Sequence, residues 1–205
     1  FGATAAAGFT VDSATQITAT SPAGSGTVDV RVTTVGGVSA TSAADEFTYV
    51  AAPTVSSVSP ATGPAAGGTS VTITGTNFSG ATAVTFGATA AAGFTVDSAT
   101  QITATSPAGS GTVDVRVTTV GGVSATSAAD EFTYVAAPTV SSVSPATGPA
   151  VGGTSVTITG TNFTGATAVS FGATAAAGFT VDSATQITAT SPAGSGTVDV
   201  RVTTV

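Results

Sequence analysis

The sequence repeats itself every 85 residues, and this repeat limits the fold more than any other feature. The stretch FGATAAAGFTVDSATQ begins at Phe1, Phe86 and Phe171 (86 − 1 and 171 − 86 both give 85). When residues 1–120 are aligned with residues 86–205, only three positions differ, and all three changes conserve size or polarity: Ala66/Val151, Ser79/Thr164 and Thr85/Ser170. A repeat of this length predicts a row of small modules that all fold in the same way.

Proline-containing segments mark the module boundaries. YVAAPTVSSVSP occurs twice, and its Ala-Ala-Pro is the expected linker because proline disfavours continuing the ladder of the strand before it. The predicted domains are residues 1–50, the C-terminal part of a module; residues 53–135, a complete module; and residues 138–205, a module without its last strand. We therefore expect the chain to be a section of a longer array.

Composition and alternation predict an all-β fold. The chain has no Leu, Lys or Met, which are good helix formers, and is rich in Thr and Val, which favour strands. Apolar residues alternate with polar ones, as in GTVDVRVTTV, and Gly- and Pro-rich turns separate such runs, with VGGVS predicted as a hairpin between the last two strands. About seven strands per module indicate a β-sandwich: residues 54–59, 69–78, 82–86, 93–98, 101–105, 111–120 and 131–135.

The motifs of the repeat resemble those of the IPT/TIG domain, an immunoglobulin-like β-sandwich. The matching motifs are P-x-V-x-x-V-x-P, G-P-x-x-G-G-T-x-V-T-I-x-G-x-N-F, the F-G after the third strand, the S-P before the sixth and the closing F-T-Y. The resemblance implies tandem immunoglobulin-like modules that form an elongated rod. Among the settings in which such domains occur, the extreme repetition and the lack of Lys fit long bacterial surface or secreted proteins.

Charge and residue content exclude several classes of function. The net charge is −7 with only three Arg, so the chain cannot form the basic surface that nucleic-acid binding requires. No apolar run approaches the length of a membrane span. There is no His, Lys or Cys to act as a base or nucleophile. We expect no enzymatic activity, no catalytic residues, no cofactor and no metal site.

Two Asn residues fit the N-glycosylation pattern. They lie in the triplets Asn77-Phe78-Ser79 and Asn162-Phe163-Thr164. The alternative, which we favour, is that each Asn binds backbone groups at a turn while the following Phe enters the core.

The acidic residues offer a weak case for calcium. Asp45-Glu46 and Asp130-Glu131 precede the last strand near a linker, and Asp12 or Asp97 could join them from another loop. Calcium needs six to eight oxygen ligands, so solvated acids are the favoured interpretation. The exposed pair Asp114 and Arg116 is expected to form a surface ion pair.

Threonine ladders are the remaining surface feature, at Thr72/Thr74 and Thr103/Thr105. They could bind glycan, carry O-glycans or order water as ice-binding sheets do. We favour the simpler interpretation that Thr is a soluble strand residue.

These observations favour a structural function. The predicted protein is a spacer in an extracellular or cell-surface bacterial adhesin stalk, fibre or filament, with neighbouring identical modules as its partners. Assembly of several chains into a homo-oligomeric filament is an open variant of this hypothesis. The alternative is a carbohydrate-binding or accessory module of a secreted polysaccharide-active protein, with a glycan as partner.

Overall fold

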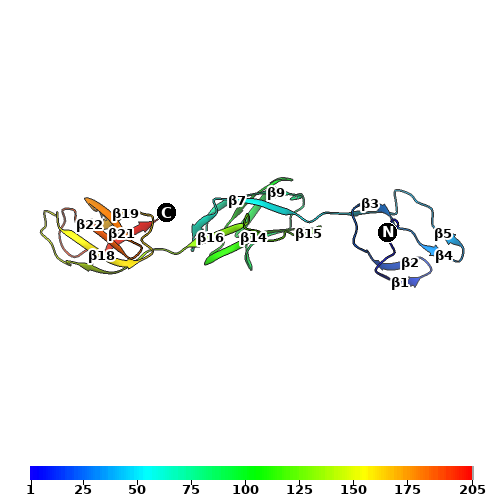
Figure 1. Ribbon diagram of the computed structural model, residues 1–205, viewed down its shortest axis with the longest axis horizontal. Coiled ribbons are helices and arrows are strands. Elements are labelled where there is room, and N and C mark those ends of the chain that lie inside the picture. Colours follow the sequence, from blue (N-terminus) through cyan, green and yellow to red (C-terminus); the bar gives the residue numbers. More distant parts are fainter. Residues whose placement is uncertain (205) are drawn as a thin grey trace.

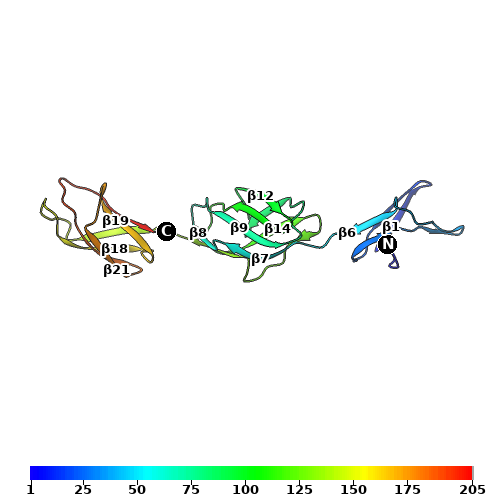
Figure 2. The ribbon, with the colours of Figure 1, turned by 90° about the horizontal axis from the view of Figure 1, so that it is seen from above.

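A computed structural model describes residues 1–204 as three units in a row (Figure 1, Figure 2). We call them the N-terminal unit (residues 1–50), the central unit (residues 53–135) and the C-terminal unit (residues 138–204). Both views place the N-terminal and C-terminal units at opposite ends of an elongated molecule. The described residues contain strands, turns and loops but no helix, which confirms the all-β prediction.

The central unit is a two-sheet sandwich. One sheet has the antiparallel order β12-β13-β9-β7; the other has the order β11-β10-β14-β16-β8, with β15 on β14 and β16 parallel to β8. Seven strands have four or more residues, as predicted, and β8, β11 and β15 are shorter additions. The strands are β7 (Thr54–Ser59), β8 (Thr62–Pro64), β9 (Ser70–Thr76), β10 (Ala83–Phe86), β11 (Thr89–Ala90), β12 (Gly93–Ser98), β13 (Gln101–Thr105), β14 (Gly111–Thr119), β15 (Gly122–Val123) and β16 (Glu131–Val135).

The core of the central unit follows the alternation in the sequence. Val71 and Ile73 of β9 are fully buried, whereas Thr72 between them faces the other side of the sheet. Both sheets contribute to one apolar cluster, so each sheet covers the inner face of the other. Its most deeply buried members include Val71, Ile73, Phe78, Val84, Phe86, Ile102, Val115, Val117 and Phe132.

The predicted hairpin of the last two strands is only partly correct. The VGGVS turn joins β14 to the two-residue β15, which pairs with Thr118 and Thr119. The last strand, β16, follows a further loop and pairs with the opposite end of β14, residues 111–114. β14 therefore pairs with β16 through its first four residues and with β15 through its last two.

The C-terminal unit has the same layout over its residues. Its sheets have the orders β17-β18-β22-β21 and β20-β19-β23, and a second apolar cluster lies between them. Residues 196–199, which correspond to the part of β14 that pairs with β16, are not in a strand. The strands are β17 (Thr139–Ser144), β18 (Ser155–Thr161), β19 (Ala166–Phe171), β20 (Thr174–Ala175), β21 (Gly178–Ser183), β22 (Gln186–Thr190) and β23 (Val200–Thr204).

The N-terminal unit consists of three separate strand pairs and exposes apolar side chains. The pairs are β1 with β2, β3 with β6, and β4 with β5. Phe9 is 69% exposed and Phe47 38%, whereas their equivalents Phe94 and Phe132 are 37% and 0% exposed. The strands are β1 (Gly8–Ser13), β2 (Gln16–Thr20), β3 (Gly26–Asp29), β4 (Thr33–Thr34), β5 (Gly37–Val38) and β6 (Glu46–Tyr49).

Candidate functional site: the junctions between units

The linkers between units are short. Only residues 50–53 separate β6 from β7, and only residues 136–138 separate β16 from β17. Pro53 is buried against the central unit, and Pro138 is half-buried. Because so few residues lie outside strands, the linkers have little freedom to act as flexible coils.

An Asn side chain holds each linker. The Nδ2 of Asn77 donates a hydrogen bond to the carbonyl of Ala52 at 3.1 Å, and Asn162 makes the same bond to Ala137 at 3.1 Å. Both Asn residues have left-handed backbone angles, with φ of 59° and 58°, a conformation that Asn tolerates better than most residues. The bond ties the end of the preceding linker to the turn after the second long strand of each module.

The Phe after each Asn anchors this turn. Phe78 and Phe163 are both completely buried. At Gly75, an added Cβ would collide with the carbonyl of Thr54 and the ring of Phe78, so the absence of a side chain there allows β7, β9 and the Phe ring to pack together. The Asn-Phe pair thus has the structural role that we favoured over N-glycosylation.

The hairpin of β14 and β15 also lies against the first linker. A Cβ at Gly121 would collide with the carbonyl of Ala51, so only glycine permits this close approach. The first linker is therefore held to the central unit at two points, by Asn77 and by the hairpin.

The two members of the acidic pair beside the second linker lie in different environments. Asp130 is completely buried, which makes the prediction of solvated acids wrong for this residue. Its Oδ1 accepts hydrogen bonds from the backbone N–H of Ser127 at 2.7 Å and from its hydroxyl at 3.2 Å, so the carboxylate closes a turn. Glu131 is exposed. Within residues 1–204, no three acidic side chains come close enough to hold a metal ion.

The equivalent Asp45 makes the same contacts in the N-terminal unit. Its carboxylate accepts hydrogen bonds from the hydroxyl and the backbone N–H of Ser42. These bonds favour the charged form and hold the pKa of Asp45 below its usual value of 3.8. Asp12 and Asp97 lie elsewhere, where each accepts a hydrogen bond from a Thr hydroxyl on the neighbouring strand.

Asp114 and Arg116 do not form the predicted ion pair. The Nε and Nη2 of Arg116 instead donate to the carbonyl of Ser124, at 3.0 and 2.8 Å. The hydroxyl of Ser124, which is fully buried, accepts a hydrogen bond from the backbone of Val117. Arg116 thus fastens the segment after β15 to β14.

The threonine ladders lie on the outer face of the sheet β12-β13-β9-β7. Thr72 and Thr103 are directly paired across β9 and β13 and are half-buried, while Thr74 is exposed and pairs with Gln101. The hydroxyl of Thr103 donates to Asp97 at 2.8 Å. Binding of glycan, O-glycosylation and ordering of water at these ladders stay predictions.

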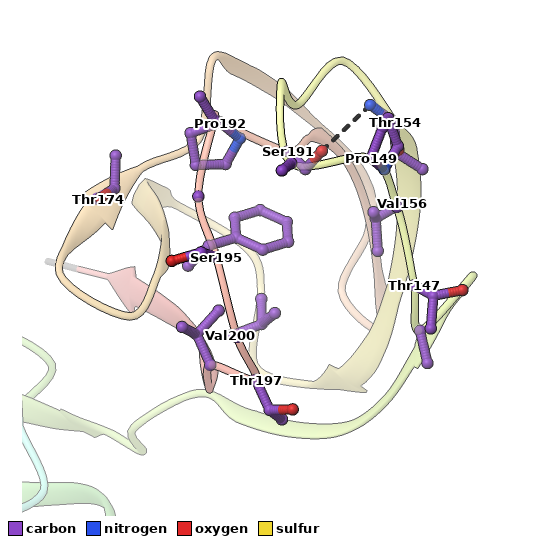
Figure 3. Close-up of a pocket in the computed structure, with 18 of the residues that line it drawn as sticks. Thr147, Pro149, Thr154, Val156, Thr174, Ser191, Pro192, Ser195, Thr197 and Val200 are labelled. Carbon is purple, nitrogen blue, oxygen red and sulfur yellow. Dashed lines mark hydrogen bonds between the residues drawn. The ribbon is translucent and has the colours of Figure 1, made fainter.

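A groove of about 460 Å³ opens in the C-terminal unit (Figure 3). Val156 and Val200 lie on opposite sides of it, and the backbone N–H of Thr154 donates to the hydroxyl of Ser191 at 3.1 Å along its rim. Its lining residues are Val, Phe, Ala, Pro, Gly, Ser and Thr, with no charged side chain among them. The groove therefore contains no group for acid–base chemistry.

The fold and these junctions define a class of protein: immunoglobulin-like β-sandwich modules in tandem. The family model for the IPT/TIG domain matches residues 53–134 and residues 138–205. The chain belongs to the IPT/TIG domain family, as its sequence motifs indicated.

Comparison with solved structures gives partial matches. The extracellular region of plexin A4 is 27% identical over 74% of this chain and 17% of that chain, with a TM-score of 0.41. The protein SGBP-B from a xyloglucan utilization locus of Bacteroides uniformis is 26% identical over 75% of this chain and 46% of that chain, with a TM-score of 0.35. The surface glycan-binding protein PbSGBP-B from Prevotella bryantii is 20% identical over 74% of this chain and 39% of that chain, with a TM-score of 0.34.

The chain spans less than half the length of each of these structures. Comparison with curated proteins gives no match. In the part of the chain that the structure describes, no helix is long and apolar enough to cross a membrane.

Proposed function

We propose that this chain is a spacer segment of an extracellular or cell-surface protein, in which identical modules set a length and carry no catalysis. The observation that carries the proposal is the pair of short linkers, in each of which a backbone carbonyl accepts a hydrogen bond from an Asn side chain of the following unit. A repeated module with a restrained junction extends in one direction, and each added copy lengthens the rod by the same step.

The path of the chain through the central unit supports a role under tension. The chain enters at β7, continues into β8 and leaves from β16, and β8 and β16 are parallel neighbours. Pulling on the two ends of the unit loads this ladder in shear. Two hydrogen bonds extend it, from the N–H of Thr133 to the carbonyl of Ala61 at 2.9 Å and from the N–H of Ala65 to the carbonyl of Val135 at 2.8 Å.

Stretching a tandem array of residues 53–137 in a force spectrometer tests this role. We expect equal unfolding events, each releasing about 300 Å of extended chain less the folded length of one unit. Ala65→Pro removes the N–H that donates to the carbonyl of Val135. Residue 65 is the second position of the turn closed by the hydrogen bond from Gly67 to Pro64, and proline is well suited to that position. We expect this variant to unfold at lower force, and unequal events or an unchanged force would contradict the proposal.

Small-angle X-ray scattering of the whole chain gives a second, independent test. The proposal requires a maximum dimension close to that of the three units in a row. A scattering profile of a compact or freely hinged chain would refute the rod.

The carbohydrate-binding alternative stays a prediction. In the central unit the aromatic side chains that could stack on sugars belong to the core, apart from Phe94, which is 37% exposed. Hits for the folded chain on a glycan array would favour this alternative, and the same hits with Phe94→Ala would assign them to another surface.

A further inference from the structure

Strand β12 forms a free edge of the central sandwich (Figure 2). It pairs with β13 on one side, and no strand within residues 1–204 pairs with its other side. In an antiparallel ladder every second residue directs its N–H and C=O away from the partner strand, so β12 presents unpaired main-chain groups. The same sequence, GFTVDS, forms β1 and β21, which pair with β2 and β22 alone. The free edge is therefore a property of the repeated module.

The other edges of the central unit are protected against pairing. β7 has a bulge between Val55 and Ser57 and is followed by Pro60. β8 has three residues and ends at Pro64, and β11 and β15 have two residues each. Short, bulged and proline-containing edges resist the addition of another strand. β12 has six residues and no proline, and its bulge lies at its end, after Val96.

The core-facing side of β12 is incompletely covered. Phe94 and Val96 pair with Ala104 and Ile102, which are both buried, so they lie on the inner side of the sheet. Phe94 is nevertheless 37% exposed, more than any other aromatic residue of the central unit. Thr95, between them, is exposed on the outer side. A strand added beside β12 would cover the Phe94 ring further and pair the free main-chain groups.

We propose that β12 pairs antiparallel with β12 of a second copy of this chain, with Thr95 opposite Thr95 at the centre of the new ladder. In this register Phe94 of each copy lies opposite Val96 of the other copy, on the core-facing side of both sheets. Cross-strand pairs of an aromatic with a β-branched residue, and of Thr with Thr, stabilise a sheet. The two four-stranded sheets become one continuous sheet across the contact.

The charge of the strand is compatible with this register. Asp97 is the only charged residue of β12, and it lies opposite Gly93 of the other copy. A Cβ at Gly93 would meet nothing within 4 Å, so the space beside it is open. The two Asp97 carboxylates are four residues apart along the ladder, about 14 Å, which exceeds the screening length of about 8 Å in physiological salt. Centring the ladder on Val96 instead would halve this separation.

The contact is isologous, because the same strand contributes both sides and a two-fold axis relates the copies. It joins two chains side by side through their sheets, whereas the linkers join modules end to end. Since the strand recurs in every module, a chain offers several such contacts. The contact needs only the edge of a module, so it does not depend on the rod.

Charge reversal at the centre of the ladder tests the proposal. Thr95 and its counterparts Thr10 and Thr180 are all exposed. One variant of the full chain changes all three to Glu and a second changes all three to Lys. In sedimentation velocity from about 10 µM to about 1 mM, we expect the unsubstituted chain to associate. Each variant alone should associate about fivefold or more weakly because like charges lie directly opposite each other, and an equal mixture should recover association because opposite charges do.

A matched control separates the edge from the overall charge. Ala99 and its counterparts Ala14 and Ala184 are exposed in the turn after the edge strand. Changing all three to Glu, or all three to Lys, gives the same net charges as the two Thr variants. These control variants should associate as the unsubstituted chain does.

A single cysteine tests the register. Directly opposite residues of antiparallel strands have Cα atoms about 4.5–5.5 Å apart, which is within the range of a disulfide. The chain contains no Cys, so under a mild oxidant Thr95→Cys should form a disulfide-linked dimer well before Ala99→Cys does.

Five results would overturn the proposal: an unsubstituted chain that stays monomeric, Thr variants that associate as strongly as the unsubstituted chain, a mixture no stronger than its components, control variants weakened as much as the Thr variants, or Thr95→Cys that cross-links no faster than Ala99→Cys. Scattering from the Glu variant of Thr95 and its counterparts, recorded where it is monomeric, tests the rod separately, so the two proposals can fail independently.

Discussion

Replacing Asn162 with Gly should loosen the junction between the central and C-terminal units without disturbing the turn that carries it. Glycine adopts the left-handed conformation of Asn162 without strain, so the variant loses mainly the hydrogen bond from Nδ2 to Ala137. A bond of this kind contributes about 0.5–1.5 kcal/mol. The ratio of held to released linkers should therefore fall about two- to twelvefold.

Spin labels on both sides of the junction measure this change. The chain contains no Cys, so Ala99→Cys and Ala184→Cys, at equivalent exposed positions, provide unique attachment sites. The pulsed-EPR distance distribution should be narrow with Asn162 and clearly broader with Asn162→Gly. Asn77→Gly, labelled at the same sites, is the matched control because it loosens only the other junction. Identical distance distributions for Asn162→Gly, Asn77→Gly and the unsubstituted labelled chain would refute the idea that the Asn162 hydrogen bond makes this junction stiff.

Three further predictions concern stability and ionisation. Gly75→Ala should destabilise the chain by about 1–3 kcal/mol in urea unfolding because its Cβ would overpack the core, while Gly93→Ala, which faces open space, should have little effect; equal effects would contradict this. The hydrogen bonds from Ser42 lower the pKa of Asp45 in the folded chain. Their stabilising effect should therefore be complete above about pH 4 and lost as the pH falls through the folded pKa. An NMR titration in which the carboxyl chemical shift of Asp45 has its midpoint at or above pH 3.8 would contradict this. Burial raises the pKa of Tyr134 above 10. In a variant with the other tyrosine changed to Phe, the ultraviolet absorbance of Tyr134 should titrate above pH 10, and the free energy of unfolding should fall as the pH rises past 10. A titration midpoint at or below pH 10 would be inconsistent with burial.

The fold was predictable from the sequence because the apolar residues alternate and the turns contain Gly and Pro. Val71 and Ile73 are buried where the pattern of β9 places them, and the following Phe78 enters the core as expected. These positions depend on local periodicity, which a single sequence displays directly.

The positions of the charged residues were harder to predict. Arg116 binds a backbone carbonyl, and the sequence does not show where that carbonyl lies. The burial of Asp130 had a readable signal, since Ser127 stands three residues before it and supplies both hydrogen bonds. A charged residue with no visible partner in the sequence is predicted to be exposed. Only the path of the loop in the structure shows that Asp130 is buried.

The near-identity of the repeats leaves side-chain complementarity unable to select which Phe-Thr-Tyr strand completes which sandwich, because every copy of the strand carries the same side chains. Attachment selects it instead. Only residues 120–130 separate β16 from β14, and this connection gives β16 a high effective concentration beside its own partner strand. A strand from another module has to repay the entropy of association before it can compete. Each module should therefore close with its own last strand, although the sequence alone would allow any copy to fit.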